Sequence, residues 1–168
     1  MNNSLSGRIV LVGPAPSLDC DPNIPLSIGR SNRGTGACLL RLLDMDTETF
    51  HVAFERHFLI PLHQGRFRGR GGDRFPRKIA RKAAELMVGR LKERTVVLIG
   101  KKVARAFSVE KTAPFEWIVV SGATMSWAPN PSGMNHWWND QANRKAGEAF
   151  FSALGQRALN STLRGLAA

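Results

Sequence analysis

Two proline-containing loops, far apart in the sequence, have the composition of a preformed small-ligand site. The first reads Gly13-Pro14-Ala15-Pro16-Ser17, and the second reads Asn130-Pro131-Ser132-Gly133-Met134-Asn135. Each follows an apolar, strand-like run. Because proline fixes φ and glycine lets the backbone approach a ligand closely, loops of this kind suit a rigid site. We expect the two loops to lie on neighbouring strand ends and to form one pocket.

A basic segment between the two loops has the composition of a phosphate-binding surface. Glycines and Phe67 separate its cations, and the arginine fork matches the oxygens of a phosphate. We expect the segment to follow a phosphate backbone; the alternative is a flexible, solvated loop, because Arg-Gly runs are often disordered. The cations are Arg66, Arg68, Arg70, Arg74, Arg77, Lys78, Arg81 and Lys82.

The charge of the whole chain favours the same kind of partner. Its 168 residues include 24 Lys and Arg against 13 Asp and Glu, which gives a formal charge of +11. An excess of this size predicts a polyanionic partner, most simply nucleic acid. The alternative is a basic surface without a specific role.

Composition also narrows the class of protein. The length fits one domain over residues 1–168. With only Cys20 and Cys38, the chain has neither a disulfide framework nor a four-cysteine iron–sulfur cluster, and its four histidines lack zinc-like spacing. We therefore expect no metal and no cofactor. The absence of a long apolar run or a signal-peptide pattern predicts a cytoplasmic protein that associates with the nucleoid through DNA. We expect the protein to be a monomer.

Alternating strands and helices must position the two loops. Hydrophobic patterning predicts strands over 8–12, 95–100, 117–120 and 123–128, with a further strand within 50–62. It predicts helices from about residue 35 and over 76–93, 101–107 and 139–163. This order predicts an α/β fold, a three-layer sandwich with a short, mainly parallel central sheet flanked by helices. Ligands of such folds bind at the carboxyl ends of the strands, where both loops fall.

Two of the predicted helices have an apolar stripe that we expect to face the core. In the helix over 76–93 the stripe contains Ile79, Ala83, Leu86, Met87 and Leu91. In the last helix it contains Ala146, Phe150, Leu154 and Ala158. Just before that helix, Trp137 and Trp138 either stack on bases and shield the site or anchor the helix in the core.

The two loops and the segments between them resemble the uracil-DNA glycosylase superfamily over about 130 residues. The second loop is most similar to that of the mismatch-specific uracil and thymine glycosylases, which have Asn where conventional enzymes have His. Other segments are similar to the thermophile-type bacterial families, although the iron–sulfur cysteines are missing. These segments are the Gly-rich stretch 28–36 before Leu39-Leu40, Asp73-Arg74-Phe75-Pro76 before a long helix, and Val96-Val97-Leu98-Ile99-Gly100.

The resemblance implies roles for the second loop. Asn130 would assist departure of the base, and the residues that follow would grip the DNA strand. By position, Met134 would fill the gap left by an extruded nucleotide; the alternative is an ordinary surface methionine. The DNA-contacting residues of this loop would be Ser132, Gly133, Met134 and Asn135.

The first loop departs from the family pattern. Pro14 and Ala15 occupy the places where family members usually have an Asp, Asn or Glu that positions the attacking water. Asp19 and Asp21 lie just downstream and could orient water and stabilise a cationic sugar; the alternative is that they are turn or cap residues. One related family with a similar Gly-x-Ala-Pro-Ala turn still cleaves.

The remaining features suggest a base other than ordinary uracil. Strict uracil enzymes have a bulky Tyr after the proline of the first loop, whereas Ser17 leaves room for a C5 substituent. His63 or Gln64 could hydrogen-bond the Watson–Crick edge of a base. The resemblance therefore predicts a monofunctional glycosylase that flips and excises a mismatched, damaged or C5-modified pyrimidine, for example a modified base of phage DNA. The alternative is a catalytically silent member of the family that binds modified or single-stranded DNA.

Overall fold

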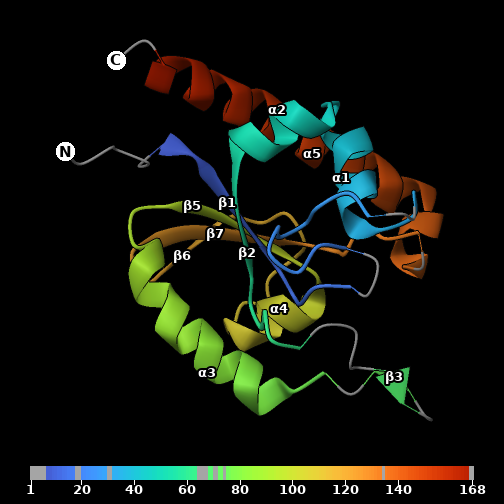
Figure 1. Cartoon of the computed structure of the whole chain (residues 1–168), viewed down its shortest axis with the longest axis vertical. Helices are drawn as coiled ribbons and strands as arrows, with labels where there is room; N and C mark the ends of the chain where they lie inside the picture. Colours follow the sequence, from blue (N-terminus) through green and yellow to red (C-terminus); the bar gives the residue numbers. More distant parts are fainter. Residues whose placement is uncertain are drawn as a thin grey trace.

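The computed structural model describes residues 7–17, 20–29, 32–63, 68–69, 72–73, 75–133 and 135–166. A five-stranded sheet with the order β2-β1-β5-β7-β6 forms its centre (Figure 1). Neighbouring strands pair in parallel, except that β6 is antiparallel to β7. In chain order the strands are β1 (Ile9–Gly13), β2 (Phe54–Phe58), β5 (Thr95–Ile99), β6 (Ile118–Val120) and β7 (Ala123–Ala128).

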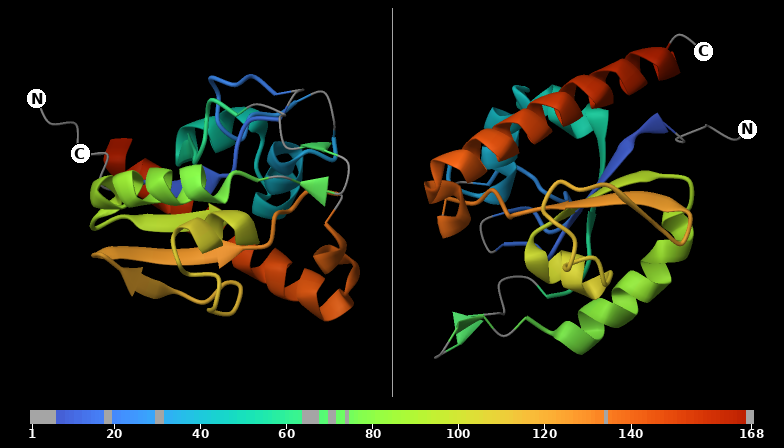
Figure 2. Two further views of the ribbon diagram at one scale, coloured as in Figure 1. Left: turned by 90° about the horizontal axis from the view of Figure 1, so that it is seen from below. Right: turned by 180° about the vertical axis from the view of Figure 1, so that it is seen from behind.

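Helices cover both faces of the sheet, as the views in Figures 1 and 2 show. One face carries α3 (Arg77–Val88) and α4 (Lys101–Ala106), and the other carries α1 (Thr35–Leu43), α2 (Thr47–Ala53) and α5 (Gln141–Leu166). The predicted α/β fold with a mainly parallel sheet flanked by helices is confirmed. Shorter elements are the 3-10 helices η2 (Gly89–Leu91) and η3 (His136–Asn139) and a hairpin of β3 (Arg68–Gly69) and β4 (Gly72–Asp73).

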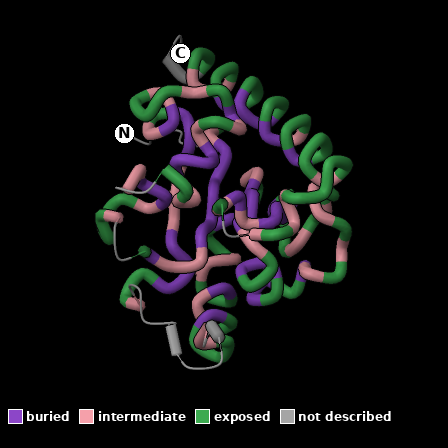
Figure 3. The backbone as a smooth tube through the Cα atoms, turned by 90° about the vertical axis from the view of Figure 1, so that its right-hand side faces the viewer, coloured by how far each residue is buried: buried purple, intermediate pink, exposed green. Residues whose placement is uncertain are grey.

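The central strands are buried on both faces, which explains their unbroken apolar sequence. In β1 all five residues are buried, and in β5 every residue except Thr95 is buried. Alternate side chains of β1 enter different cores: Val10 and Val12 face α3 and α4, whereas Ile9 and Leu11 face the other helices. In Figure 3 the buried residues, in purple, gather in the interior of the molecule, and the exposed residues, in green, lie on the outer turns.

The segment 50–62 contains a strand, β2, as predicted, and its first residues, 50–53, belong to the helix α2. Asp46 caps α2 by accepting a hydrogen bond from the backbone N–H of Thr49 at 2.7 Å, and that interaction lowers the pKa of Asp46. Phe50 and Ala53, three residues apart, are buried on one side of the helix. The strand β2 therefore begins only at Phe54.

The buried face of α3 differs from the prediction. The structure buries the alanines Ala80 and Ala84, whose small side chains let the helix lie close to the sheet. Ile79 is 49% exposed and Leu86 is 67% exposed, so the predicted stripe was wrong for these two residues. Leu91, in η2, is buried as expected.

The buried stripe of α5 is also displaced. Leu154 and Ala158 are buried as predicted, but Ala146 is exposed and its neighbour Gly147 is buried instead. A Cβ on Gly147 would lie 2.3 Å from the ring of Trp138, and one on Gly155 would lie 2.7 Å from the carbonyl oxygen of Leu43. The two glycines let α5 pack closely against Trp138 and the end of α1.

An ion pair ties the amino-terminal ends of the central strands together. Arg94, just before β5, donates to Glu55 of β2 at 2.5 Å and to the carbonyl oxygen of Arg8 at 3.2 Å. His57 contacts the other carboxylate oxygen of Glu55 at 2.8 Å. Burial by itself would raise the pKa of Glu55, but the hydrogen bonds and charges of His57 and Arg94 outweigh it and lower that pKa.

Arg94→Met is expected to lower the free energy of unfolding by about 2 kcal/mol at neutral pH, because it leaves a half-buried carboxylate with one partner fewer. The folded-state pKa of Glu55 lies below its unfolded value, so the pair stabilises the fold above that unfolded pKa. This stabilisation is lost as the pH falls through the folded-state pKa, and the variant's deficit should shrink below about pH 4. Urea unfolding at several pH values measures both effects.

Arg90→Met is the matched control for this experiment, because Arg90 is exposed and has no ion pair within the described residues. It should unfold at the wild-type urea concentration. An equal loss of stability in both variants would contradict a specific role for the Arg94–Glu55 pair.

Candidate functional site

The two proline loops leave the same end of the sheet. Strand β1 ends at Gly13 and β7 at Ala128, and β5 lies between these two strands and pairs with both. The prediction that the two loops lie on neighbouring strands was therefore wrong, because one strand separates them. Two strand spacings place the starts of the loops about 10 Å apart. We call this region the carboxyl end of the sheet, meaning the carboxyl-terminal ends of β1, β5 and β7 with the two loops.

Four hydrogen bonds fix Asn130 in the second loop. Its side-chain oxygen Oδ1 accepts from the Thr35 hydroxyl at 2.7 Å and from the backbone N–H of Ser132 at 3.3 Å. Its backbone oxygen accepts from Asn135 Nδ2 at 2.8 Å and from the Trp138 indole at 3.0 Å. Because a backbone N–H only donates, the group facing Ser132 must be the carboxamide oxygen. The Nδ2 amide of Asn130 is therefore left as the donor.

The end of β5 makes the floor beneath Asn130. Gly100 donates its N–H to Ala128 at 2.7 Å and has a φ of +97°, a conformation that glycine adopts readily. A Cβ built on Gly100 would lie 3.6 Å from Cβ of Asn130. The backbone of the second loop thus lies directly over the end of the central strand.

The second loop also docks on the start of α1. The N–H of Gly133 donates to the carbonyl oxygen of Arg33 at 3.0 Å, and a Cβ on Gly133 would lie 3.2 Å from Cβ of Arg33. Ser132 is half-buried and Gly133 is exposed, while Met134 lies outside the described residues. The sequence analysis predicted no role for Thr35 or Arg33. The sequence Gly-Thr-Gly at the start of α1 is the pattern that could have indicated Thr35.

The first loop continues beside the chain that follows β2. The carbonyl oxygens of Gly13 and Pro14 accept from the N–H groups of Leu59 at 2.8 Å and Ile60 at 3.1 Å. Pro16 is buried, Ala15 packs against the core under α3 and α4, and Ser17 is exposed. The first loop is therefore fixed to the chain that follows β2, and its Ser17 end is exposed to solvent.

Of the other residues predicted to act in catalysis, base recognition or DNA binding, the structure describes only some. Asp21 is exposed and accepts from the N–H of Asn23 at 2.8 Å, which closes a turn, and its catalytic role stays a prediction. His63 is half-buried just after β2, and its N–H donates to Ile60 at 3.3 Å. The described residues exclude Asp19, Gln64, Arg66, Arg70 and Arg74, and of Arg68 only the backbone is described.

The neighbouring residues Trp137 and Trp138 pack against aromatic side chains of the protein. Trp138 lies against α5 and donates to Asn130, and its ring is 4.9 Å from that of Trp137. Trp137 is 5.7 Å from Phe115, which in turn is 4.8 Å from Phe150 of α5. Both tryptophans are half-buried. They anchor the start of α5, as one of the two sequence interpretations predicted, and connect it to the second loop.

Lys102, two residues after Gly100 at the end of β5, has a lowered pKa and an aromatic neighbour. Lys102 Nζ is 5.8 Å from the centre of the Phe75 ring, a cation–π distance. Partial burial lowers the pKa of its ammonium group. Phe75 immediately precedes Pro76 and α3, so this contact joins the starts of α3 and α4.

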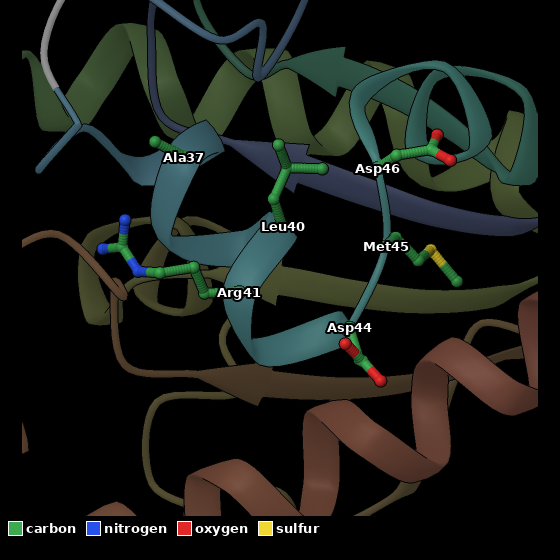
Figure 4. Close-up of a pocket in the computed structure, with 6 residues that line it drawn as sticks. All are labelled: Ala37, Leu40, Arg41, Asp44, Met45 and Asp46. Carbon is green, nitrogen blue, oxygen red and sulfur yellow. The ribbon is translucent and has the colours of Figure 1, made fainter.

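A hollow of about 510 Å³ lies elsewhere, along α1 and the residues that follow it, from Ala37 to Asp46 (Figure 4). Its charged lining already has structural roles: Arg41 donates to the carbonyl oxygen of Asn32 at 2.9 Å, and Asp46 caps α2. Asp44 is the left-handed residue that ends α1. We therefore place the candidate site at the carboxyl end of the sheet.

Searches for other kinds of site and for relatives gave negative results. Among the described residues, no group of three His, Cys, Asp or Glu side chains is placed to hold a metal ion. No helix within the same residues is long and apolar enough to cross a membrane. A scan against protein-family models and a search of curated proteins found no match.

Proposed function

We propose that this protein is a DNA glycosylase of the uracil-DNA glycosylase superfamily, with the fold of that superfamily. It would flip a mismatched, damaged or C5-modified pyrimidine and hydrolyse its N-glycosidic bond. The observation that carries the proposal is the fixed orientation of Asn130. Among the described residues no hydrogen bond engages its amide group, which can donate at the carboxyl end of the sheet, between two proline loops that resemble those of the superfamily.

The chemistry requires a donor at this place. When the glycosidic bond breaks, the pyrimidine leaves with the bonding electron pair, so that negative charge is shared by N1 and the carbonyl oxygens of the base, and the sugar becomes cationic. A donor whose position is set before the reaction stabilises that charge without reorganisation. Thr35 and Ser132 hold the carboxamide oxygen of Asn130, so the Nδ2 amide would donate to a carbonyl oxygen of the departing base.

The first loop would set the choice of base. The starts of the two loops lie about 10 Å apart, and the flipped base would lie over the end of β5 between them. Ser17, at the exposed end of the first loop, is too small to exclude a substituent at C5. The proposed substrates are therefore pyrimidines larger than uracil at that position, and the partner is DNA.

A second candidate function is a silent reader that binds a modified base without cleaving it. Two observations favour it: Pro14 and Ala15 offer no side chain to orient water, and the carboxylate of Asp21 is engaged in a turn. In that case Asn130 would recognise a base and no water would be activated. The two candidates share a site and differ in turnover.

Incubation with a panel of modified DNAs decides between them. Duplex and single-stranded DNAs would carry uracil, mismatched thymine or C5-modified pyrimidines, with released bases identified by mass spectrometry. We expect release of one C5-substituted pyrimidine. Tight binding of one modified DNA without release would establish the silent reader, and equal binding of all DNAs without release would contradict both candidates.

A further inference from the structure

One layer of the molecule holds a concentration of positive charge. The helices α3 and α4 contain seven cations and one carboxylate, Glu85, whereas the three helices of the opposite face, α1, α2 and the much longer α5, together contain five cations and two carboxylates. All seven cations are exposed. We call them the basic layer: Arg77, Lys78, Arg81 and Lys82 of α3 with Lys101, Lys102 and Arg105 of α4.

Most of this charge is not neutralised within the protein. Arg81 pairs with Glu85 at 3.4 Å, and Arg105 approaches Glu110 at 3.9 Å. Within the described part of the chain, no ion pair engages the other α3 cations or Lys101. Exposed like charges that lie close together repel each other, and an anionic partner relieves that repulsion. The cations that have no acidic partner among the described residues are Arg77, Lys78, Lys82 and Lys101.

The placement of these cations does not serve helix stability. Arg77 and Lys78 lie in the first turn of α3, where the helix dipole disfavours positive charge, and that turn has no acidic residue. The last turn of α3, where the dipole favours cations, has no basic residue. The cations of α3 therefore gather in its first half, close to the Phe75–Lys102 contact at the carboxyl end of the sheet.

We propose that the DNA backbone flanking the reacting nucleotide lies across the basic layer, on the α3 and α4 side of the sheet, and not across α1 and α2. That the polyanion is DNA rests on the proposed function; the position of the surface rests on the distribution of charge. The layer continues the basic segment that begins at residue 66, and α4 adds cations that lie far from that segment in sequence. Phosphates would replace the missing acidic partners.

The test compares two double variants that remove the same charge from opposite layers. Lys78→Gln/Lys82→Gln alters the basic layer, and Lys145→Gln/Arg164→Gln alters exposed cations of α5. Glutamine and lysine have similar helix propensities, so the folds should be equally stable. The probe is a short DNA duplex without any modified base, with binding measured by filter retention between about 0.05 M and 0.2 M salt.

We expect the basic-layer variant to bind about 10-fold more weakly at the higher salt, and its log–log salt slope to fall by roughly 1 to 2. The α5 variant should bind within about 2-fold of wild type, because its charges lie outside the proposed surface. Equal weakening in both variants, or none in the first, would overturn the proposal. So would a clear preference for an RNA duplex of the same sequence.

Lys78→Glu separates binding from folding. Because a carboxylate in the first turn is favoured by the helix dipole, this variant should be as stable as wild type or slightly more stable. It should nevertheless lose more affinity than Lys78→Gln. Since the probe contains no lesion, the binding results are independent of base release. If the protein excises a base but the variants bind the probe as wild type does, only the proposed DNA-binding surface is wrong. If the variants bind more weakly but no base is released, only the proposed glycosylase activity is wrong.

Discussion

Gly36→Ala is expected to destabilise the protein by roughly 3 kcal/mol, because the new methyl group has no space. A Cβ on Gly36 would lie 2.4 Å from the carbonyl oxygen of Ser27 and 2.7 Å from that of Leu26. Both contacts are with backbone, which cannot move aside as the end of a side chain can. The start of α1 would have to shift away from the 26–27 segment. Urea unfolding measures the loss.

Gly89→Ala is the control for the same change at an unconstrained glycine. Gly89 has a helical φ of −63°, and no atom lies within 4 Å of an added Cβ. Alanine there should stabilise the protein by about 0.5–1 kcal/mol, since it restricts the unfolded chain and favours helix. The two substitutions thus have opposite expected signs. A Gly36→Ala protein that unfolds at the wild-type urea concentration would show that α1 does not pack on this segment.

Asn130→Ala is expected to slow base release by about 10²–10³-fold, the usual consequence of removing one preorganised donor from a site of developing negative charge. DNA binding should change little, because that energy comes mainly from phosphate contacts. Asn130→Asp keeps the shape but replaces the donor by a carboxylate, and it should be at least as slow. Single-turnover release of the base identified with the DNA panel gives the rates, and filter binding gives the affinities.

Substitutions of Thr35 distinguish a poorly oriented amide from a missing one. Thr35→Val removes the hydroxyl that donates to Asn130, so the amide can rotate and the rate should fall by an intermediate factor. Thr35→Ser retains the hydroxyl and should restore most of the activity. If Thr35→Val and Thr35→Ser release base equally fast, the hydroxyl does not orient Asn130. If Asn130→Ala releases base at the wild-type rate, the donor role itself is wrong.

The sequence predicted the central strands well and the helix faces less well. Strands β1 and β5 are almost entirely apolar, and β7 has apolar residues at four of its six positions, so their positions followed mainly from hydrophobicity. In α3 the largest apolar side chains were expected to be buried, but tertiary packing instead selected Ala80 and Ala84, which bring the helix close to the sheet. A periodic pattern does not show how near a neighbouring element lies.

The site was predictable in its loops but not in its contacts. Proline and glycine next to apolar strands marked both loops, and the order of elements placed them at one end of the sheet. The hydrogen bond between Thr35 and Asn130 joins residues 95 apart, and it exists only because the second loop crosses β5 to reach the start of α1. Such a contact depends on strand order, which hydrophobic patterning does not contain.

The aromatic cluster behind the second loop gives the protein an intrinsic optical reporter. The chain has four tryptophans and no tyrosine, so its ultraviolet fluorescence comes almost entirely from indoles. Trp117, Trp137 and Trp138 belong to the ring cluster that borders α5, and Trp138 donates directly to Asn130. The fourth, Trp127, is buried and donates to Thr112. Emission should therefore respond when a base displaces or tightens the Asn130 loop, without any added label.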